Sequence, residues 1–105
     1  MRIFIESSES KNVILIFADE RLDLSAYGTF SEAAWIASNN PLATAIVVDL
    51  GRTKQLFDSG KAMLLSLHKM AGRLKNRIYL TNVGPGIKHQ LSQGKIPSMF
   101  YIKHD

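Results

Sequence analysis

The chain has 105 residues, of which 46% are hydrophobic, and it contains no cysteine. This length and apolar content predict one globular domain, spanning residues 1–105, with a real hydrophobic core. The absence of cysteine excludes disulfides, thiolate metal sites and a cysteine nucleophile. No segment approaches the run of about 18 apolar residues that spans a membrane, and Met1 to Glu6 lack the apolar core of a signal peptide. We therefore expect a cytoplasmic protein without a membrane span.

The formal net charge of +4 is unevenly divided along the chain. Residues 1–50 hold three Lys or Arg against seven Asp or Glu, whereas residues 51–105 hold ten basic residues against two acidic ones. A basic half indicates either a solvated surface or an acidic partner. Nucleic acid is not favoured as the partner, because the basic residues are not interleaved with stacking aromatic residues.

The first half of the chain predicts two strands and a helix. Residues 1–7 and 12–17 alternate as strands, and the polar residues 8–11 between them predict a hairpin. A helix is predicted from Ser25 to the stop signal at residues 39–41. Trp35 and Ile36 point away from its apolar side, which leaves a homodimer contact, a second partner surface or packing by a terminal segment open. The predicted apolar stripe of this helix is Tyr27, Phe30, Ala33, Ala34 and Ala37.

A strand, a polar connector and an amphipathic helix follow. The branched apolar run at residues 45–50 predicts a strand that is covered on both faces. Asp58 or Ser59 is the expected N-cap of a helix over about residues 59–74. The predicted buried stripe of this helix is Met63, Leu67, Met70 and Leu74, with Leu64 and Ala71 beside it. The residues expected to lie off this stripe and to face solvent are Lys61, Leu65, His68 and Lys69.

The last part of the chain predicts a strand at residues 77–81, a short helix after residues 84–86 and a final strand at residues 99–102. Pro85 suits the first turn of that helix because its missing N–H would have no partner there. The predicted order is β-β-α-β-α-β-α-β. We therefore expect an α/β fold with a mixed, mainly parallel sheet and helices packed on it.

The chain offers little chemistry for catalysis. His68, His89 and His104 have neither a ligand spacing of i, i+4 nor a nearby acidic partner, so we expect no metal site, no cofactor and no enzymatic activity. Asp19, Asp23 and Asp49 would meet at one end of the sheet if the strands there are parallel. These carboxylates suit either turn and cap chemistry or an acidic cluster in a small ligand-binding or enzymatic domain.

Three segments carry a resemblance to a known family. The first is ERLDLSAY at residues 20–27. The second consists of VVDL at residues 47–50 followed by LFDSGKAMLL at residues 56–65. The third is NVGPGI at residues 82–87. In order and spacing they resemble the STAS domain of bacterial anti-sigma-factor antagonists over nearly the whole chain. The resemblance implies a STAS-like fold and a regulatory role without catalysis.

In that family the loop before the second helix reads Asp-Ser-Ser/Thr-Gly or Ala, and its first Ser is phosphorylated by an anti-sigma factor that is also a kinase. Aligned without gaps, Phe57 falls on the family Asp, Asp58 on the acceptor Ser and Ser59 on the second hydroxyl residue. A shift by one residue would instead make Ser59 the acceptor. We adopt the ungapped alignment, because a slip of one residue at a helix start rotates the side chains by about 100°.

The resemblance implies a docking surface for an anti-sigma factor or a Ser/Thr-kinase-type switch protein. Its centre would be Asp58, Ser59 and Gly60, surrounded by Lys61, Arg52, Lys54 and Leu65. Binding there would release a sigma factor, and the permanent charge of Asp58 would replace a phosphorylation switch. An accessory subunit that docks on a transporter or its ATPase remains an alternative of the same fold.

Overall fold

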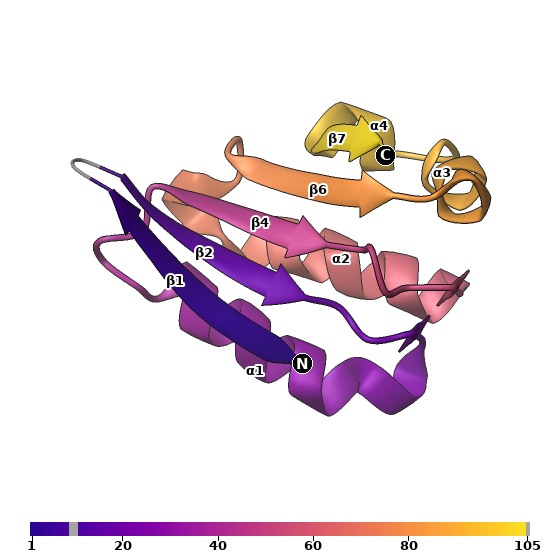
Figure 1. The fold of residues 1–105 in the computed structure, drawn as a ribbon, viewed down its shortest axis with the longest axis horizontal. Helices are drawn as coiled ribbons and strands as arrows, with labels where there is room; N and C mark the ends of the chain where they lie inside the picture. Colours follow the sequence, from indigo (N-terminus) through magenta and orange to yellow (C-terminus); the bar gives the residue numbers. More distant parts are fainter. Residues whose placement is uncertain (9–10, 105) are drawn as a thin grey trace.

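The computed structural model describes residues 1–8 and 11–104. Its main sheet has five strands in the order β1-β2-β4-β6-β7 (Figure 1). β1 pairs with β2 in antiparallel register, and the other neighbouring strands are parallel. This confirms the predicted mixed, mainly parallel sheet; two residues of the expected hairpin turn, Glu9 and Ser10, lie outside the described residues. The strands are β1 (Arg2–Ser8), β2 (Lys11–Phe17), β4 (Ala45–Asp49), β6 (Ile78–Val83) and β7 (Tyr101–His104).

The two long helices, α1 (Tyr27–Ser38) and α2 (Asp58–Met70), lie on the same side of this sheet (Figure 1). α1 connects β2 to β4, and α2 connects β4 to β6. Each connection moves to the next strand in the same direction across the sheet. Because crossovers between parallel strands are right-handed, connections that all step in one direction place their helices on one face.

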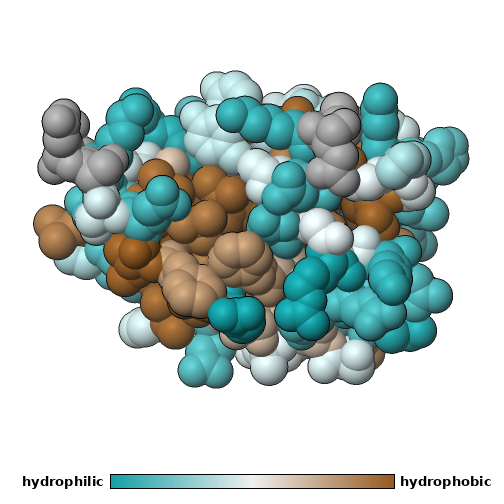
Figure 2. All heavy atoms as spheres, viewed as in Figure 1, coloured by the Kyte–Doolittle hydropathy of each residue, from teal (hydrophilic) through white to brown (hydrophobic). Residues whose placement is uncertain are grey.

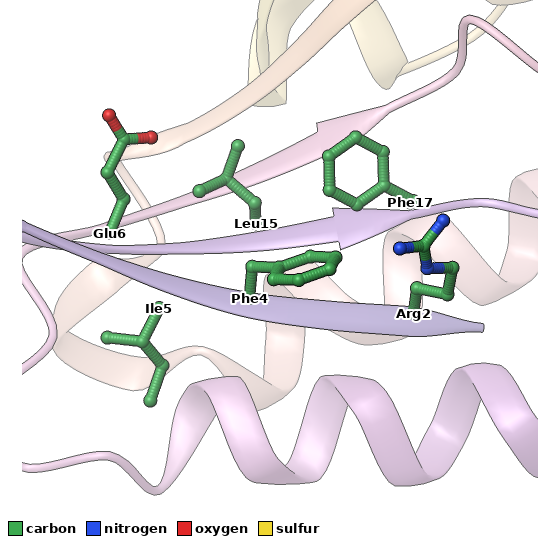
Figure 3. A pocket seen from close by; sticks show the side chains of 6 residues that line it. All are labelled: Arg2, Phe4, Ile5, Glu6, Leu15 and Phe17. Atoms are coloured by element: carbon green, nitrogen blue, oxygen red, sulfur yellow. The ribbon is translucent and has the colours of Figure 1, made fainter.

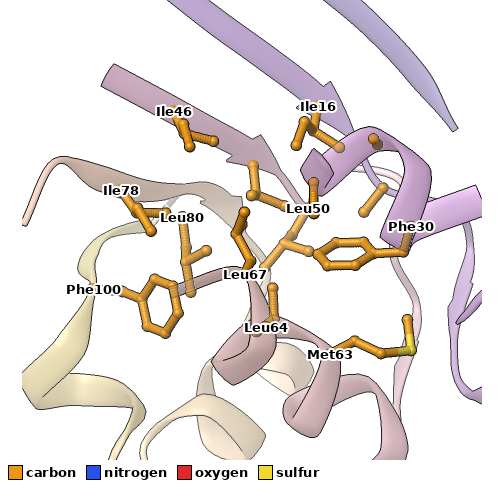
Figure 4. Packing of buried hydrophobic residues seen from close by; sticks show 14 of the residues in the cluster. Ile16, Phe30, Ile46, Leu50, Met63, Leu64, Leu67, Ile78, Leu80 and Phe100 are labelled. Carbon is orange, nitrogen blue, oxygen red and sulfur yellow. The ribbon is translucent and has the colours of Figure 1, made fainter. Parts of the chain in front are cut away.

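The hydrophobic core fills the space between the sheet and these helices (Figure 4). Alternate residues of the strands point into it, as the strand period of two requires. Each fully buried large apolar side chain contributes about 1.5–3 kcal/mol to folding. The main members of the core are Ile14, Ile16, Ile46, Val48, Ile78 and Leu80 from the sheet, Phe30 from α1, and Met63, Leu64 and Leu67 from α2.

The prediction that the central strand is covered on both faces is wrong. Ile46 and Val48 of β4 are fully buried, whereas Ala45, Val47 and Asp49 on the other face are only half-buried. A run of apolar residues shows that a strand lies in the sheet interior, but the direction of the crossovers decides whether helices cover its second face.

The structure adds short elements that the sequence patterns did not predict. β3 (Arg21–Leu22) and β5 (Gln55–Leu56) form a small parallel sheet of their own. Two 3₁₀ turns, η1 (Leu24–Ala26) and η2 (Gly72–Leu74), flank the long helices. η1 precedes α1, so the α-helix begins at Tyr27 rather than at Ser25.

The second predicted helix is shorter than expected. α2 ends at Met70 because Gly72 adopts a positive φ of 59°, which ends the α-helical backbone. Near the C-terminus, α3 (Pro85–Leu91) begins at the proline as predicted. Beyond it, α4 (Ile96–Met99) takes up the start of the predicted last strand, so β7 begins at Tyr101.

Two residues assigned to buried stripes are exposed. Tyr27 and Met70 are 56% and 42% exposed, respectively. Tyr27 is the first residue of α1 and Met70 the last of α2, and both line the groove between the two helices, where side chains at a helix end are less covered. Trp35 and Ile36 are exposed as predicted, at 60% and 39%. Among the described residues, no helix is long and apolar enough to cross a membrane.

The side chain of Arg73, in η2 just after α2, stabilises the connection between α1 and β4. The guanidinium of Arg73 donates to the backbone carbonyl of Ala43 at 2.8 Å and to those of Asn40 and Pro41 at 3.1 Å each. These carbonyls belong to a segment without regular structure, so the arginine supplies partners that a helix or sheet would otherwise provide.

Replacing Arg73 with Met removes these donors and keeps most of the aliphatic stem. We expect the free energy of unfolding to fall by about 1 kcal/mol, since the bonds are charge-assisted but partly exposed. Urea denaturation followed by circular dichroism measures this. Lys75→Met is the matched control, with an expected change within about 0.5 kcal/mol; equal losses in both variants would contradict this role of Arg73.

Candidate functional site

The small β3–β5 sheet positions the start of α2. Leu22 pairs with Leu56 in parallel register, and the N–H of Phe57 donates to the carbonyl of Leu22 at 3.2 Å. The N–H groups of Lys54 and Gln55 both donate to the carbonyl of Glu20, at 2.8 and 3.2 Å. The first turn of α2 therefore lies against the segment that enters the first helix.

Gly60 is the point of closest approach between α2 and that segment. A Cβ atom at this position would lie 2.1 Å from the carbonyl oxygen of Leu22 and 2.9 Å from Cδ1 of Leu56. Contacts below 3.0 Å with backbone atoms are not tolerated, so the chain itself would have to move. Glycine at residue 60 thus allows the helix start to pack directly on the β3 backbone.

The helix start differs by one residue from the prediction. Phe57 is the N-cap and makes no capping bond with its side chain, whereas Asp58 is the first helical residue. Asp58 is fully exposed and Ser59 is half-buried. The carboxylate of Asp58 therefore stands at the positive end of the helix dipole, where a negative charge is stabilised.

An aromatic and a guanidinium group flank this helix start. The guanidinium of Arg21 lies over the ring of Phe57, 4.9 Å from its centroid. It also bonds the carboxylate of Asp23 at 3.1 Å and the side-chain oxygen of Gln55 at 2.7 Å. Phe57 is 39% exposed. The surface thus presents a cation and an aromatic ring beside Asp58.

Lys61 is less exposed than its helical position predicts. Its side chain is only 15% exposed, and its ammonium lies 3.6 Å from Asp58 Oδ1 and 3.5 Å from Gln93 Oε1. The expectation that Lys61 faces solvent is wrong because the segment after α3, which carries Gln93, covers that side of α2. Lys61 remains next to Asp58 and partly offsets its charge.

Two other predicted members of the docking surface lie in the loop between β4 and β5. Arg52 and Lys54 are both exposed. The ammonium of Lys54 is 3.9 Å from a carboxylate oxygen of Glu20, with both side chains mostly exposed. Both residues stand on the approach to α2 rather than on the helix itself.

Leu65 lies about two turns further along α2 and contributes to a separate groove. It is half-buried and packs against the core, as does Met99 of α4, so the expectation that it faces solvent is wrong. His68 is also half-buried, with its ring 5.6 Å from that of Phe100. The groove is basic, and its lining residues are Leu65, His68, Lys69, Lys75, Lys95 and Met99.

Asp23 has a structural role beside the helix start. Its carboxylate accepts bonds from the hydroxyl and the backbone N–H of Ser25, which caps η1, and it bonds Arg21. The hydroxyl of Ser25 is the main cause, and Arg21 a further one, that the pKa of Asp23 lies below its ordinary value of 3.8.

The carboxylates at the strand ends do not form an acidic cluster. Asp49 accepts from the backbone N–H of Gly51 at 2.7 Å and from the side-chain amide of Asn82 at 2.8 Å, which is turn chemistry. Asn82 adopts a positive φ of 55°. Within residues 1–8 and 11–104, no group of three His, Asp or Glu side chains is placed to hold a metal ion.

Comparison with solved structures identifies this arrangement. The anti-sigma factor antagonist SpoIIAA in its unphosphorylated form matches with a TM-score of 0.60 and 19% identity, over 96% of this chain and 86% of that one. The Bacillus cell fate determinant SpoIIAA in its phosphorylated form matches with a TM-score of 0.61 and 18% identity, over 96% of this chain and 90% of that one. The chain has the STAS fold. No protein-family model and no curated protein matches the sequence.

The STAS fold confirms the resemblance found in the three sequence segments. The structure brings Asp58, Ser59, Gly60 and Lys61 together at the helix start and places Leu65 in the basic groove. Sequence reasoning missed Arg21 and Phe57 as neighbours of Asp58, because their contact depends on the pairing of β3 with β5.

Substituting Gly60 with Ala tests the close approach. We expect the free energy of unfolding to fall by about 2 kcal/mol or more, because the added methyl group would overlap the carbonyl of Leu22. Gly86→Ala in α3 is the matched control, since a Cβ there meets no atom within 4 Å and should leave stability unchanged or slightly higher. Urea denaturation compares the two, and equal stability of both variants would contradict the packing.

The lowered pKa of Asp23 predicts a pH dependence of stability. Because the folded pKa lies below the unfolded value of 3.8, this carboxylate stabilises the fold above pH 3.8, and the contribution is lost as the pH falls through the folded pKa. Asp23→Asn should therefore reduce the melting temperature at neutral pH and weaken its fall below pH 4. Thermal unfolding between pH 2.5 and 7 checks this, with Asp19→Asn as control; parallel curves for wild type and Asp23→Asn would contradict it.

Proposed function

We propose that this protein is a regulatory binding module that docks on an anti-sigma factor or a related kinase-type switch protein and thereby frees a sigma factor. The solved structures with the same fold include an anti-sigma factor antagonist in unphosphorylated and phosphorylated forms, which supports this role. The module acts by competition, because the switch protein holds either this module or the sigma factor. No catalytic step by this chain is required.

The start of α2 is the docking surface in this proposal. The observation that carries it is a fully exposed Asp58 in the first turn of a helix that Gly60 fixes against β3. Ser59, Lys61 and the Arg21–Phe57 pair surround the carboxylate, while Arg52 and Lys54 extend the surface along the preceding loop. A rigid helix start with one exposed charge gives a partner a fixed point of recognition.

Asp58 stands in for the phospho-acceptor serine in this proposal. A carboxylate carries about one charge, whereas a phosphoserine carries about −1.5 to −2 and three acceptor oxygens. The partner surface is therefore matched to a permanent single charge, and phosphorylation at position 58 no longer controls binding. Lys61 and the loop residues Arg52 and Lys54 add positive charge near this carboxylate.

The open hollows of the surface favour binding of a protein over binding of a small molecule. The polar hollow nearest the strand ends opens to solvent. Its lining includes Glu20 from the loop after β2, Arg21 of β3 and Gln55 of β5. Small-molecule sites instead enclose most of their ligand in a concave, largely apolar pocket. This observation weighs against the ligand-binding or enzymatic alternative.

The test mixes the purified protein with a candidate anti-sigma factor of the Ser/Thr-kinase type and ATP, and follows complex formation and intact mass. We expect a complex with the wild type and no added phosphate. Asp58→Ser should restore an acceptor and gain one phosphate at residue 58. Asp58→Lys should weaken the complex about tenfold, because the partner is matched to a negative charge.

Glu32→Lys on the exposed side of α1 is the matched charge-reversal control and should leave affinity unchanged. A phosphate on Ser59 of the wild type would overturn the assignment of Asp58 and make Ser59 the acceptor. No complex with any kinase-type anti-sigma factor would overturn the proposed function and turn attention to a transporter or its ATPase as partner.

A further inference from the structure

The sheet face opposite α1 and α2, here called the open face, carries an unbroken row of apolar and aromatic side chains. The residues of this row lie side by side on neighbouring strands, in the order Phe4, Leu15, Val47, Tyr79 and Tyr101. This middle row therefore crosses all five strands of the sheet. Phe4 and Tyr101, at its two ends, are 48% and 56% exposed.

The side chains of the open face form a continuous surface. Phe4 packs edge-on against Phe17 at 5.6 Å, and the rings of Tyr79 and Tyr101 stack at 5.1 Å. Hydrophobic residues gather in Figure 2 over β1 and β2. Figure 3 shows the shallow hollow there, in which Leu15 and Phe17 stand beside Phe4. Contiguous exposed apolar surface of this kind marks an interaction site.

Charged side chains flank the middle row in a pattern that is complementary to itself. On β1, Arg2 precedes Phe4 by two residues and Glu6 follows it by two, so all three lie on the open face. Among the described residues, neither Arg2 nor Glu6 has an ion-pair partner within the chain. A two-fold axis along the middle row would reverse the strand direction and bring Arg2 of each copy over Glu6 of the other.

The same axis matches the charges on the central strands. Arg77 lies two residues before Tyr79, in line with Ala45, and so stands on one side of the middle row. Asp49 lies two residues after Val47, on the other side of the row. Rotation about the middle row would place Arg77 across the interface from Thr81 of the second copy, displaced sideways by one strand spacing, about 4.8 Å, from Asp49 of that copy. The open face carries the cations Arg2, Lys11, Arg77 and Lys103 together with the carboxylates Glu6 and Asp49. A second copy supplies cations that match both carboxylates, so these mixed charges fit a second copy.

We propose that two copies of this chain associate through their open faces about a two-fold axis along the middle row. The contact is isologous, so each ion pair occurs twice, and the two sheets stack as in an aligned sandwich. The apolar row is buried at the centre and the ion pairs lie at its rim, which is the usual anatomy of a stable interface. This association does not depend on the function proposed above.

Charge reversal tests the two-fold pairing directly. Arg2→Glu alone and Glu6→Arg alone each bring like charges together twice, and we expect dimer affinity to fall at least about tenfold. The double variant Arg2→Glu/Glu6→Arg should recover the dimer. An equimolar mixture of the two single variants should form a heterodimer, because both of its ion pairs then join opposite charges. Sedimentation velocity across micromolar to millimolar concentrations measures each case.

Lys88→Glu on α3 and Glu32→Arg on α1 are the matched controls, since both residues are exposed and lie outside the open face. They should leave the dimer unchanged. Recovery in the mixture also shows that both single variants are folded. A wild type that stays monomeric at millimolar concentration would overturn the proposal and leave the face to a different partner. A dimer that neither reversal weakens, or that the double variant does not restore, would equally overturn it.

Discussion

The direction in which the chain winds across its sheet is the constraint on which the rest of the structure depends. From β2 onward, every parallel connection steps to the next strand on the same side, giving the order β2-β4-β6-β7. With right-handed crossovers, this places α1 and α2 on one face. The core then forms on that face alone, and the opposite face keeps side chains such as Val47 and Tyr79 that no helix covers.

The same winding brings the start of α2 to the edge where the parallel strands end. There the short β3–β5 pairing and the lack of a side chain at Gly60 hold the first turn against the carbonyl of Leu22. The exposed carboxylate of Asp58 is thus carried by a backbone with little freedom to move. Such preorganisation lowers the entropy cost of recognition, so a single charge at this point can discriminate between partners.

Much of the fold could be predicted because its long elements follow their periodicities. The strand at residues 45–49 and the helix from residue 58 carry enough apolar residues to be found from pattern alone. The covering of the second face could not be found in this way, because β4 has the same composition whether one or both faces are covered. The contact of Arg21 with Phe57 depends on a pairing of two-residue strands, which have no period to detect. Lys61 was misplaced because the covering segment around Gln93 is remote in sequence.

The two proposed surfaces are compatible, since α2 lies on the face opposite to the open face. An axis along the middle row reverses the strand direction of the second copy, so the edges that carry Asp58 point to opposite ends of a dimer. The docking surface of each copy then stays accessible. Because the two docking surfaces lie at opposite ends of the dimer, they cannot bind the same small partner at once. A dimer of this geometry would gain avidity only toward a partner that is itself dimeric or arrayed with matching spacing. Toward a monomeric partner it would bind two copies independently.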